Sequence, residues 1–154
     1  MSKQLKRGHK PAILIQAKLH KKLYKAVHTL FQHKQDWLMR QIQMLIEFIA
    51  RITLNKASIT HEMDEQQMGE TGELYMQLKE LLAADSICAA DDALTDNFNK
   101  DNDHLRLAMW FYSEINNLTD KELEASNFSR QEIYEGLQEV LSRNGISLLS
   151  LEGL

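Results

Sequence analysis

The most strongly patterned segment of the sequence is residues 36–56, where apolar side chains recur at alternating spacings of four and three. The stripe consists of Leu38, Ile42, Leu45, Ile49 and Ile52. These spacings put side chains on one face of an α-helix, and further apolar residues on the neighbouring faces widen the apolar surface beyond the usual arc. We therefore predict a long apolar helix at 36–56, with Asp36 as its N-cap and the other helices packed around it.

This segment is nearly long enough to cross a lipid bilayer, but three charged residues interrupt it. They are Arg40, Glu47 and Arg51, and each would cost about 2.5 kcal/mol near the centre of a membrane. The sequence thus predicts a core helix of a soluble protein. The single cysteine, Cys88, excludes an intramolecular disulfide and fits a cytoplasmic protein, in which we expect it to be a small buried residue.

The charge of the chain is divided between two regions of opposite sign. Residues 1–35 hold nine Lys/Arg and no acidic residue, a formal charge of +9. Residues 36–154 hold the other nine Lys/Arg and all 22 Asp/Glu, a formal charge of −13. The pattern predicts a basic N-terminal arm at 1–34 and an acidic all-helical domain at 35–154, with either an anionic partner for the arm or docking of the arm on the acidic domain.

Within the arm, residues 12–31 form the pattern of a cationic amphipathic helix. The apolar positions lie on one helical face: Ala12, Ile15, Leu19, Leu23, Ala26, Val27 and Leu30. The lysines lie largely off that face and are candidate contacts to an anionic surface: Lys18, Lys21, Lys22 and Lys25. Such helices bind anionic membranes or the groove of a partner protein, unless the apolar face packs on the same chain. With one Arg and one aromatic pair in the arm, base readout is not indicated, so nucleic acid is a weaker candidate than a membrane.

Capping residues divide the rest of the chain into further helices. We predict helices at 73–84 and 87–94 joined as a hairpin, a helix at 103–117 capped from the Asn/Asp-rich loop before it, and two helices started by the capping boxes at Thr119 and Ser129. The last of these ends at Asn144–Gly145, and the tail at 146–154 docks on the domain. No segment shows the two-residue apolar/polar alternation of a β-strand. We therefore predict an all-α fold class, a bundle of antiparallel helical hairpins around the 36–56 helix.

No motif in the sequence predicts catalysis, a metal or a cofactor. The segment His61-Glu62-Met63-Asp64-Glu65 has Glu65 where a zinc peptidase needs its second His. The Asn/Asp residues at 97–103 fit no calcium-loop register, and His28 and His33 are five residues apart. We therefore expect a protein that is not an enzyme.

Three segments carry a resemblance to a known family: 36–42 (DWLMRQI), 72–75 (GELY) and 127–133 (NFSRQEI). Over about residues 33–147 the chain resembles an uncharacterised family of small helical proteins from Gram-positive bacteria. The family is regarded as similar to tetratricopeptide-repeat hairpins, which implies a degenerate repeat pair at 73–117, and it supplies no activity or catalytic residue. Its members begin shortly before the Asp-aromatic motif. This implies that residues 1–32 are either an added arm or precede a natural start near Val27 or Leu30, and an intact mass of the native protein would decide.

The function predicted from the sequence is a non-enzymatic helical module for protein–protein interaction. Its protein partner is unknown, and a second copy of the chain is one candidate. Trp37 and Trp110 are the candidate partner-facing residues, although large aromatic side chains are more often part of a core. The alternative is peripheral binding of the basic N-terminal helix to an anionic membrane surface or to nucleic acid. Neither the partner nor the biological process follows from these residues.

Overall fold

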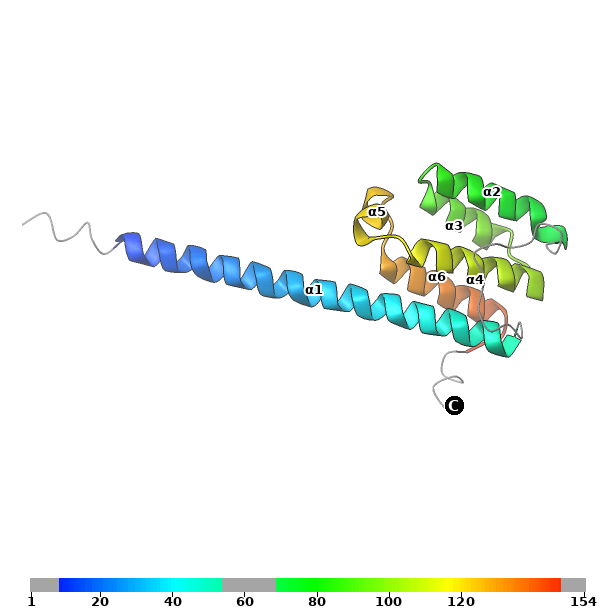
Figure 1. Cartoon of the computed structure of the whole chain (residues 1–154), viewed down its shortest axis with the longest axis horizontal. Coiled ribbons are helices and arrows are strands. Elements are labelled where there is room, and N and C mark those ends of the chain that lie inside the picture. Colours follow the sequence, from blue (N-terminus) through cyan, green and yellow to red (C-terminus); the bar gives the residue numbers. More distant parts are fainter. Residues whose placement is uncertain (1–8, 54–68, 148–154) are drawn as a thin grey trace, which may run out of the picture. The chain divides into compact units, whose positions relative to one another are not determined.

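The computed structural model describes residues 9–53 and 69–147, and all regular secondary structure within them is helical. The elements are α1 (His9–Thr53), the short 3₁₀ helix η2 (Gly69–Thr71), α2 (Gly72–Ala83), α3 (Ile87–Asp96), α4 (Asn102–Asn116), α5 (Asp120–Ala125) and α6 (Arg130–Arg143) (Figure 1). The predicted all-α fold class is confirmed for these residues. The His61 motif and most of the polar segment before α2 lie outside them.

The chain divides into two compact units, Met1–Trp37 (unit 1) and Leu38–Leu154 (unit 2), and the boundary falls inside α1. The two helices predicted at 12–31 and 36–56 are therefore both parts of α1, and residues 54–56 of the second lie outside the described residues. Asp36 was expected to be an N-cap but is an interior residue of α1. The reason is that the joining residues, Gln32 to Gln35, include neither Gly nor Pro and consist mostly of good helix formers.

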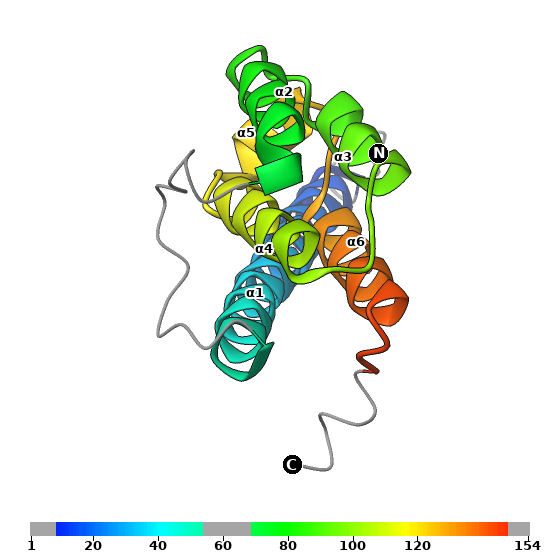
Figure 2. The same ribbon diagram turned by 90° about the vertical axis from the view of Figure 1, so that its right-hand side faces the viewer.

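The core of unit 2 is organised around α4, which lies between α6 and the α2–α3 pair (Figures 1 and 2). From His104 to Asn116, only Arg106 and Glu114 are not fully buried. This is a correction to the prediction that the 36–56 helix is central. From Leu38 onward α1 buries one face and leaves Met44 and Ile52 exposed, because its charged residues are incompatible with a helix enclosed on all sides.

Three of the predicted helix starts are confirmed by cap hydrogen bonds. The Asp101 carboxylate accepts from the backbone N–H of His104 at 2.8 Å, which caps α4. The capping boxes of Thr119 with Glu122 and of Ser129 with Glu132 are both formed and start α5 and α6. These side chains accept hydrogen bonds that the first turn of a helix cannot make internally.

Three helices end with a residue in the left-handed region, at Asp85 (φ 55°), Asn127 (φ 52°) and Gly145 (φ 74°). At each end the next residue donates its N–H to a carbonyl five residues back, as Ile146 does to Leu141 at 2.9 Å. This is the Schellman arrangement, which satisfies the last carbonyl groups of the helix. The predicted Asn144–Gly145 end of α6 is confirmed. Of the predicted tail, Ile146 packs against the core, and residues 148–154 lie outside the described residues.

A buried arginine joins the helices of unit 2 at one end. The Arg130 guanidinium donates to Asp120 Oδ1 at 2.9 Å, to the Asn116 carbonyl at 2.8 Å and to the Leu118 carbonyl at 2.6 Å. Asn116 in turn donates its Nδ2 to the carbonyl of Met39 at 3.0 Å. Because a buried guanidinium without partners would cost several kcal/mol, roughly, these contacts hold α6 against α4 and the start of α5.

A part-buried hydrogen bond joins α3 to α4, and α6 passes close to it. The Tyr112 hydroxyl donates to Asp91 Oδ1 at 2.9 Å. Burial raises the pKa of the Asp91 carboxyl, while the Tyr112 hydrogen bond lowers it, and the net direction is upward. A Cβ atom at Gly136 would lie only 2.6 Å from the Tyr112 hydroxyl oxygen, so the absence of a side chain at this position lets α6 approach Tyr112.

Candidate functional site

The exposed apolar side chains of the described residues are concentrated in unit 1. Of the thirteen large hydrophobic residues that are exposed, ten lie between residues 13 and 37: Ile13, Leu14, Ile15, Leu19, Leu23, Tyr24, Val27, Leu30, Phe31 and Trp37. The other three are Met44, Ile52 and Met76 in unit 2. Scattered exposed apolar residues are normal in proteins, but a contiguous set of this size marks an interaction surface.

Six of these residues form one face of α1, which we call the arm face. It consists of Ile15, Leu19, Leu23, Val27, Leu30 and Trp37. At about 100° per residue their positions fall within an arc of about 120°. Leu30 is 69% exposed and Trp37 is 56% exposed. The arm face is thus an extended apolar strip of exposed side chains.

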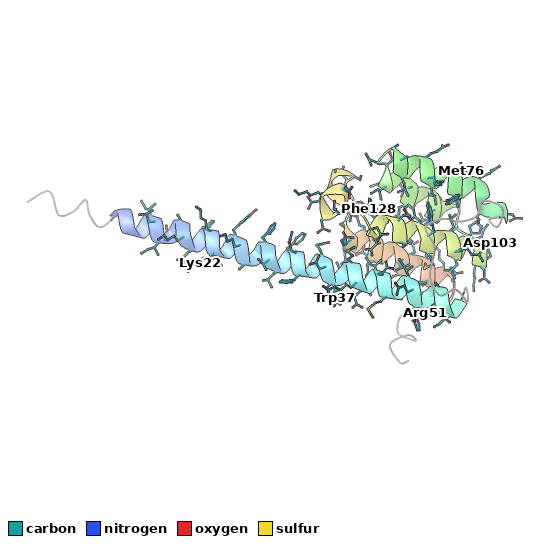
Figure 3. The ribbon with its side chains drawn as sticks, in the orientation of Figure 1. Lys22, Trp37, Arg51, Met76, Asp103 and Phe128 are labelled. Atoms are coloured by element: carbon teal, nitrogen blue, oxygen red, sulfur yellow. The ribbon has the colours of Figure 1, made fainter. Side chains whose placement is uncertain are left out.

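The four lysines singled out from the sequence lie on another side of the same helix. Lys18, Lys21, Lys22 and Lys25 are all exposed, and their positions span an arc of about 100° that does not overlap the arm face. Figure 3 labels Lys22 and Trp37, one from each set, with the side chains of unit 1 standing out from the helix. Unit 1 therefore presents an apolar side and a cationic side.

Few side-chain contacts hold the described part of unit 1. The Thr29 hydroxyl donates to the Lys25 carbonyl at 2.8 Å, and the Tyr24 and His28 rings stack with centroids 6.1 Å apart. Every residue from Ile13 to Lys34 is exposed. Local helix geometry alone sets the directions of the lysines and of the arm face.

The two candidate tryptophans lie in different environments. Trp37 is exposed, as a partner-facing residue requires. Trp110 is only 4% exposed and packs edge to face against Tyr75, with ring centroids 4.8 Å apart. Its indole is part of the core of unit 2, because α4 is covered on all sides, so Trp110 is not available to a partner in this structure.

The described part of unit 2 contains one acid–base pair that was not anticipated from the sequence, His104 with Asp101. The His104 Nδ1 lies 2.8 Å from Asp101 Oδ2. Burial raises the pKa of Asp101, but hydrogen bonds from the His104 backbone and ring outweigh it and hold the pKa below its ordinary value. The pair caps the N-terminus of α4 and does not line an open cleft, since His104 is buried and packs edge to face against Phe98.

A shallow pocket of about 130 Å³ lies where the α2–α3 turn, the end of α4 and α5 meet. Its lining combines the acidic residues Asp85, Glu114 and Glu122 with apolar ones. Glu122 is committed to the capping box of α5, where it accepts from Thr119 at 2.7 Å. Asp85, Glu114 and Glu122 are not part of a metal-binding group of side chains among the described residues.

The described residues offer neither a metal-binding cluster nor a membrane-spanning helix. They contain no group of three or more His, Cys, Asp or Glu side chains placed to hold a metal ion. Within the same residues, none of the helices has the length and apolar character needed to cross a membrane.

Comparison with known proteins places the chain beside a family of unknown function. The model of a family of unknown function matches residues 32–145, which cover most of unit 2 and the last part of unit 1. No curated protein and no solved structure matches the chain.

Proposed function

The chain belongs to the family of unknown function DUF6483, and from this starting point we propose that it is a non-enzymatic helical interaction module. Unit 2 is the folded support, and the arm face of unit 1 binds the partner. The observation that carries the proposal is the accessibility of the arm face, from Ile15 to Trp37. Removing such a surface from water is the main favourable term in most associations.

The proposal also includes finer features of the fold and setting. We propose that the helix pairs of unit 2 are antiparallel hairpins of the tetratricopeptide type and that the protein works in the cytoplasm of a Gram-positive bacterium. The pairing of α2 with α3 and of α4 with α6 supports the first of these. The single cysteine supports the cytoplasmic setting, and the family resemblance of segments 36–42, 72–75 and 127–133 supports the Gram-positive source.

The arm face is tested by co-purification from the source cell with three full-length proteins. These are the wild type, a variant with Leu19→Gln, Leu23→Gln and Leu30→Gln, and a control with Met44→Gln, Ile52→Gln and Met76→Gln. The control replaces the same number of exposed apolar residues, all in unit 2. Gln is a good helix former, so both variants keep their helices.

We expect the wild type and the control to retain the same bound protein, lipid or nucleic acid, and the arm-face variant to lose it. If the arm-face variant retains everything that the wild type retains, unit 1 is not the binding surface and the proposal is wrong. Circular dichroism on each protein verifies that the helices are intact.

A further inference from the structure

We infer that the partner of the arm is an anionic lipid bilayer, with the unit 1 part of α1 lying in the plane of the membrane interface. The inference rests on the proposed function, because it names the chemistry that the arm face binds. It follows from the requirement that one partner must satisfy both the apolar and the cationic side of this helix.

The apolar side needs a partner that accepts a long one-sided strip. The arm face runs from Ile15 to Trp37, and Lys34 is the one charged residue of that stretch whose position falls within its arc. A bilayer interface accepts an amphipathic helix along its whole length, because the acyl region has no fixed shape to match. A helix in this position buries its Leu and Trp side chains and keeps its backbone hydrogen bonds internal.

The cationic side needs negative charge next to the apolar region. Lys18, Lys21, Lys22 and Lys25 extend from the helix on flexible four-carbon stems, which can bend toward lipid headgroups at the level of the interface. Unit 1 holds nine basic residues and a single acidic one, Asp36. Anionic lipid headgroups attract such a segment by about a fivefold gain in affinity for each lysine.

The other candidate partners satisfy only one side. A second copy of the arm would bring two strongly positive segments together. The acidic domain of a second copy has the right charge, but its exposed large apolar residues, among those described, are Met44, Ile52 and Met76, which are too few to cover the arm face. Nucleic acid would pair with the lysines but would leave Leu19, Leu23 and Leu30 in water.

The experiment is sedimentation of the full-length protein with lipid vesicles. One set is pure phosphatidylcholine, and the other contains about one-third phosphatidylglycerol to supply a negative surface. We expect the protein to bind the anionic vesicles. Raising NaCl from about 0.1 M to about 1 M should weaken this binding, because the Debye screening length falls from roughly 10 Å to roughly 3 Å.

Two variants test the two sides separately. Replacing Lys18, Lys21, Lys22 and Lys25 together by Gln should weaken binding to anionic vesicles by about 600-fold, from about fivefold for each lysine. The matched Lys→Arg variant keeps the charge and should bind like the wild type. Leu19→Gln with Leu23→Gln and Leu30→Gln should weaken binding by about tenfold or more for each leucine, whereas the unit 2 control, Met44→Gln with Ile52→Gln and Met76→Gln, should have no effect.

Each opposite result overturns the inference. Failure of the wild type to bind anionic vesicles, or equal binding to neutral ones, rules out an anionic bilayer. Binding to a DNA duplex that survives the leucine substitutions would assign the arm to nucleic acid instead. If co-purification yields a protein held through the arm face and the vesicles bind nothing, the lipid inference fails while the proposed function stands.

Discussion

At the scale of single residues, Gly136 has a role in packing that its sequence context does not reveal. We predict that Gly136→Ala lowers the free energy of unfolding by about 1–2 kcal/mol, because overpacking outweighs the better helix propensity of Ala. The new Cβ atom would lie 2.6 Å from the Tyr112 hydroxyl oxygen, which Asp91 holds in place. Urea unfolding measures the change.

Two comparisons make this prediction specific. Gly72→Ala is the control, since a Cβ there would have no atom within 4 Å. Combining Gly136→Ala with Tyr112→Phe removes the oxygen that the methyl group meets, so the two changes should cost less together than the sum of their separate costs. Strict additivity would mean that the two residues do not interact.

The half-buried Asp91 carboxyl predicts a pH dependence. Its pKa is raised in the folded protein, chiefly by burial, so the folded state binds this proton more readily than the unfolded chain. The contribution of Asp91 to stability therefore falls as pH rises from the unfolded pKa, about 3.9, through the folded one. We predict that Asp91→Asn, which keeps an acceptor for Tyr112, is at least as stable as the wild type at pH 7.

This advantage of Asp91→Asn should shrink below about pH 4, where the wild-type carboxyl is protonated in both states. The measurement is the difference in unfolding free energy between variant and wild type at several pH values. Asp92→Asn controls for the lost charge, because Asp92 is an exposed neighbour. A difference that stays constant with pH would contradict the assignment.

Several residue environments could not be predicted from the sequence because they depend on tertiary contacts. Arg130 reads as an ordinary charged residue at the start of a helix, yet it is buried among carbonyl groups from α4 and the following turn. Cys88 was expected to be buried and is exposed, since Ile87, Ala90 and Leu94 take the buried face of α3. The apolar pattern of a helix does not show which residues next to its buried face are also buried by other helices.

At the scale of helices, the left-handed helix ends at Asp85 and Asn127 offer a direct test. Non-glycine residues tolerate this region poorly, although Asn and Asp do so better than most. We predict that Gly at either position leaves stability unchanged or raises it by up to about 1 kcal/mol, whereas Val lowers it by about 1–2 kcal/mol. Thermal unfolding measures both.

Ala84→Val is the control for the turn at Asp85. Ala84 lies one residue earlier with φ −91°, where a β-branched side chain is not excluded. Equal losses from Val at positions 84 and 85 would show that bulk, rather than the left-handed backbone, is responsible.

Helix boundaries were predicted well where a local signal decides them and poorly where none does. Asp101, Thr119, Ser129 and Gly145 mark their helix ends correctly, because caps and left-handed turns act within four residues. Asp36 was misread, because an Asp can cap a helix or lie within one. A Gly or Pro just before Asp36 would have indicated that a new helix begins there, but the preceding residues include neither.

At the scale of the whole molecule, the two units should respond differently to loss of apolar side chains. We predict that Leu19→Gln with Leu23→Gln and Leu30→Gln changes the unfolding free energy of unit 2 by no more than about 0.5 kcal/mol, because these leucines are exposed. Ile42→Ala should cost about 2–5 kcal/mol, because Ile42 is fully buried. In a Trp37→Phe background, fluorescence of the buried Trp110 follows unit 2 alone. A large loss from the leucine substitutions would mean that the arm face is covered.

The candidate site could be predicted from the sequence in part. The spacings of Leu19, Leu23 and Leu30 and of the lysines define two sides of a helix by geometry alone. Whether the apolar side is covered depends on the rest of the molecule, which the spacing of residues within one helix does not specify. Trp110 shows the same dependence, because its burial comes from the helices around α4.

The enclosure of α4 has a consequence for how the protein can vary. Most helices have a solvent-facing stripe where nearly any residue is accepted, so tolerance of mutation rises and falls with every turn. From Leu107 to Ser113 every position of α4 is buried, which leaves no such stripe. In a saturation scan scored by cellular abundance, we expect an unbroken block of intolerant positions there, while α6 shows tolerated positions at regular intervals. Neutral drift in this family should therefore be slowest in α4.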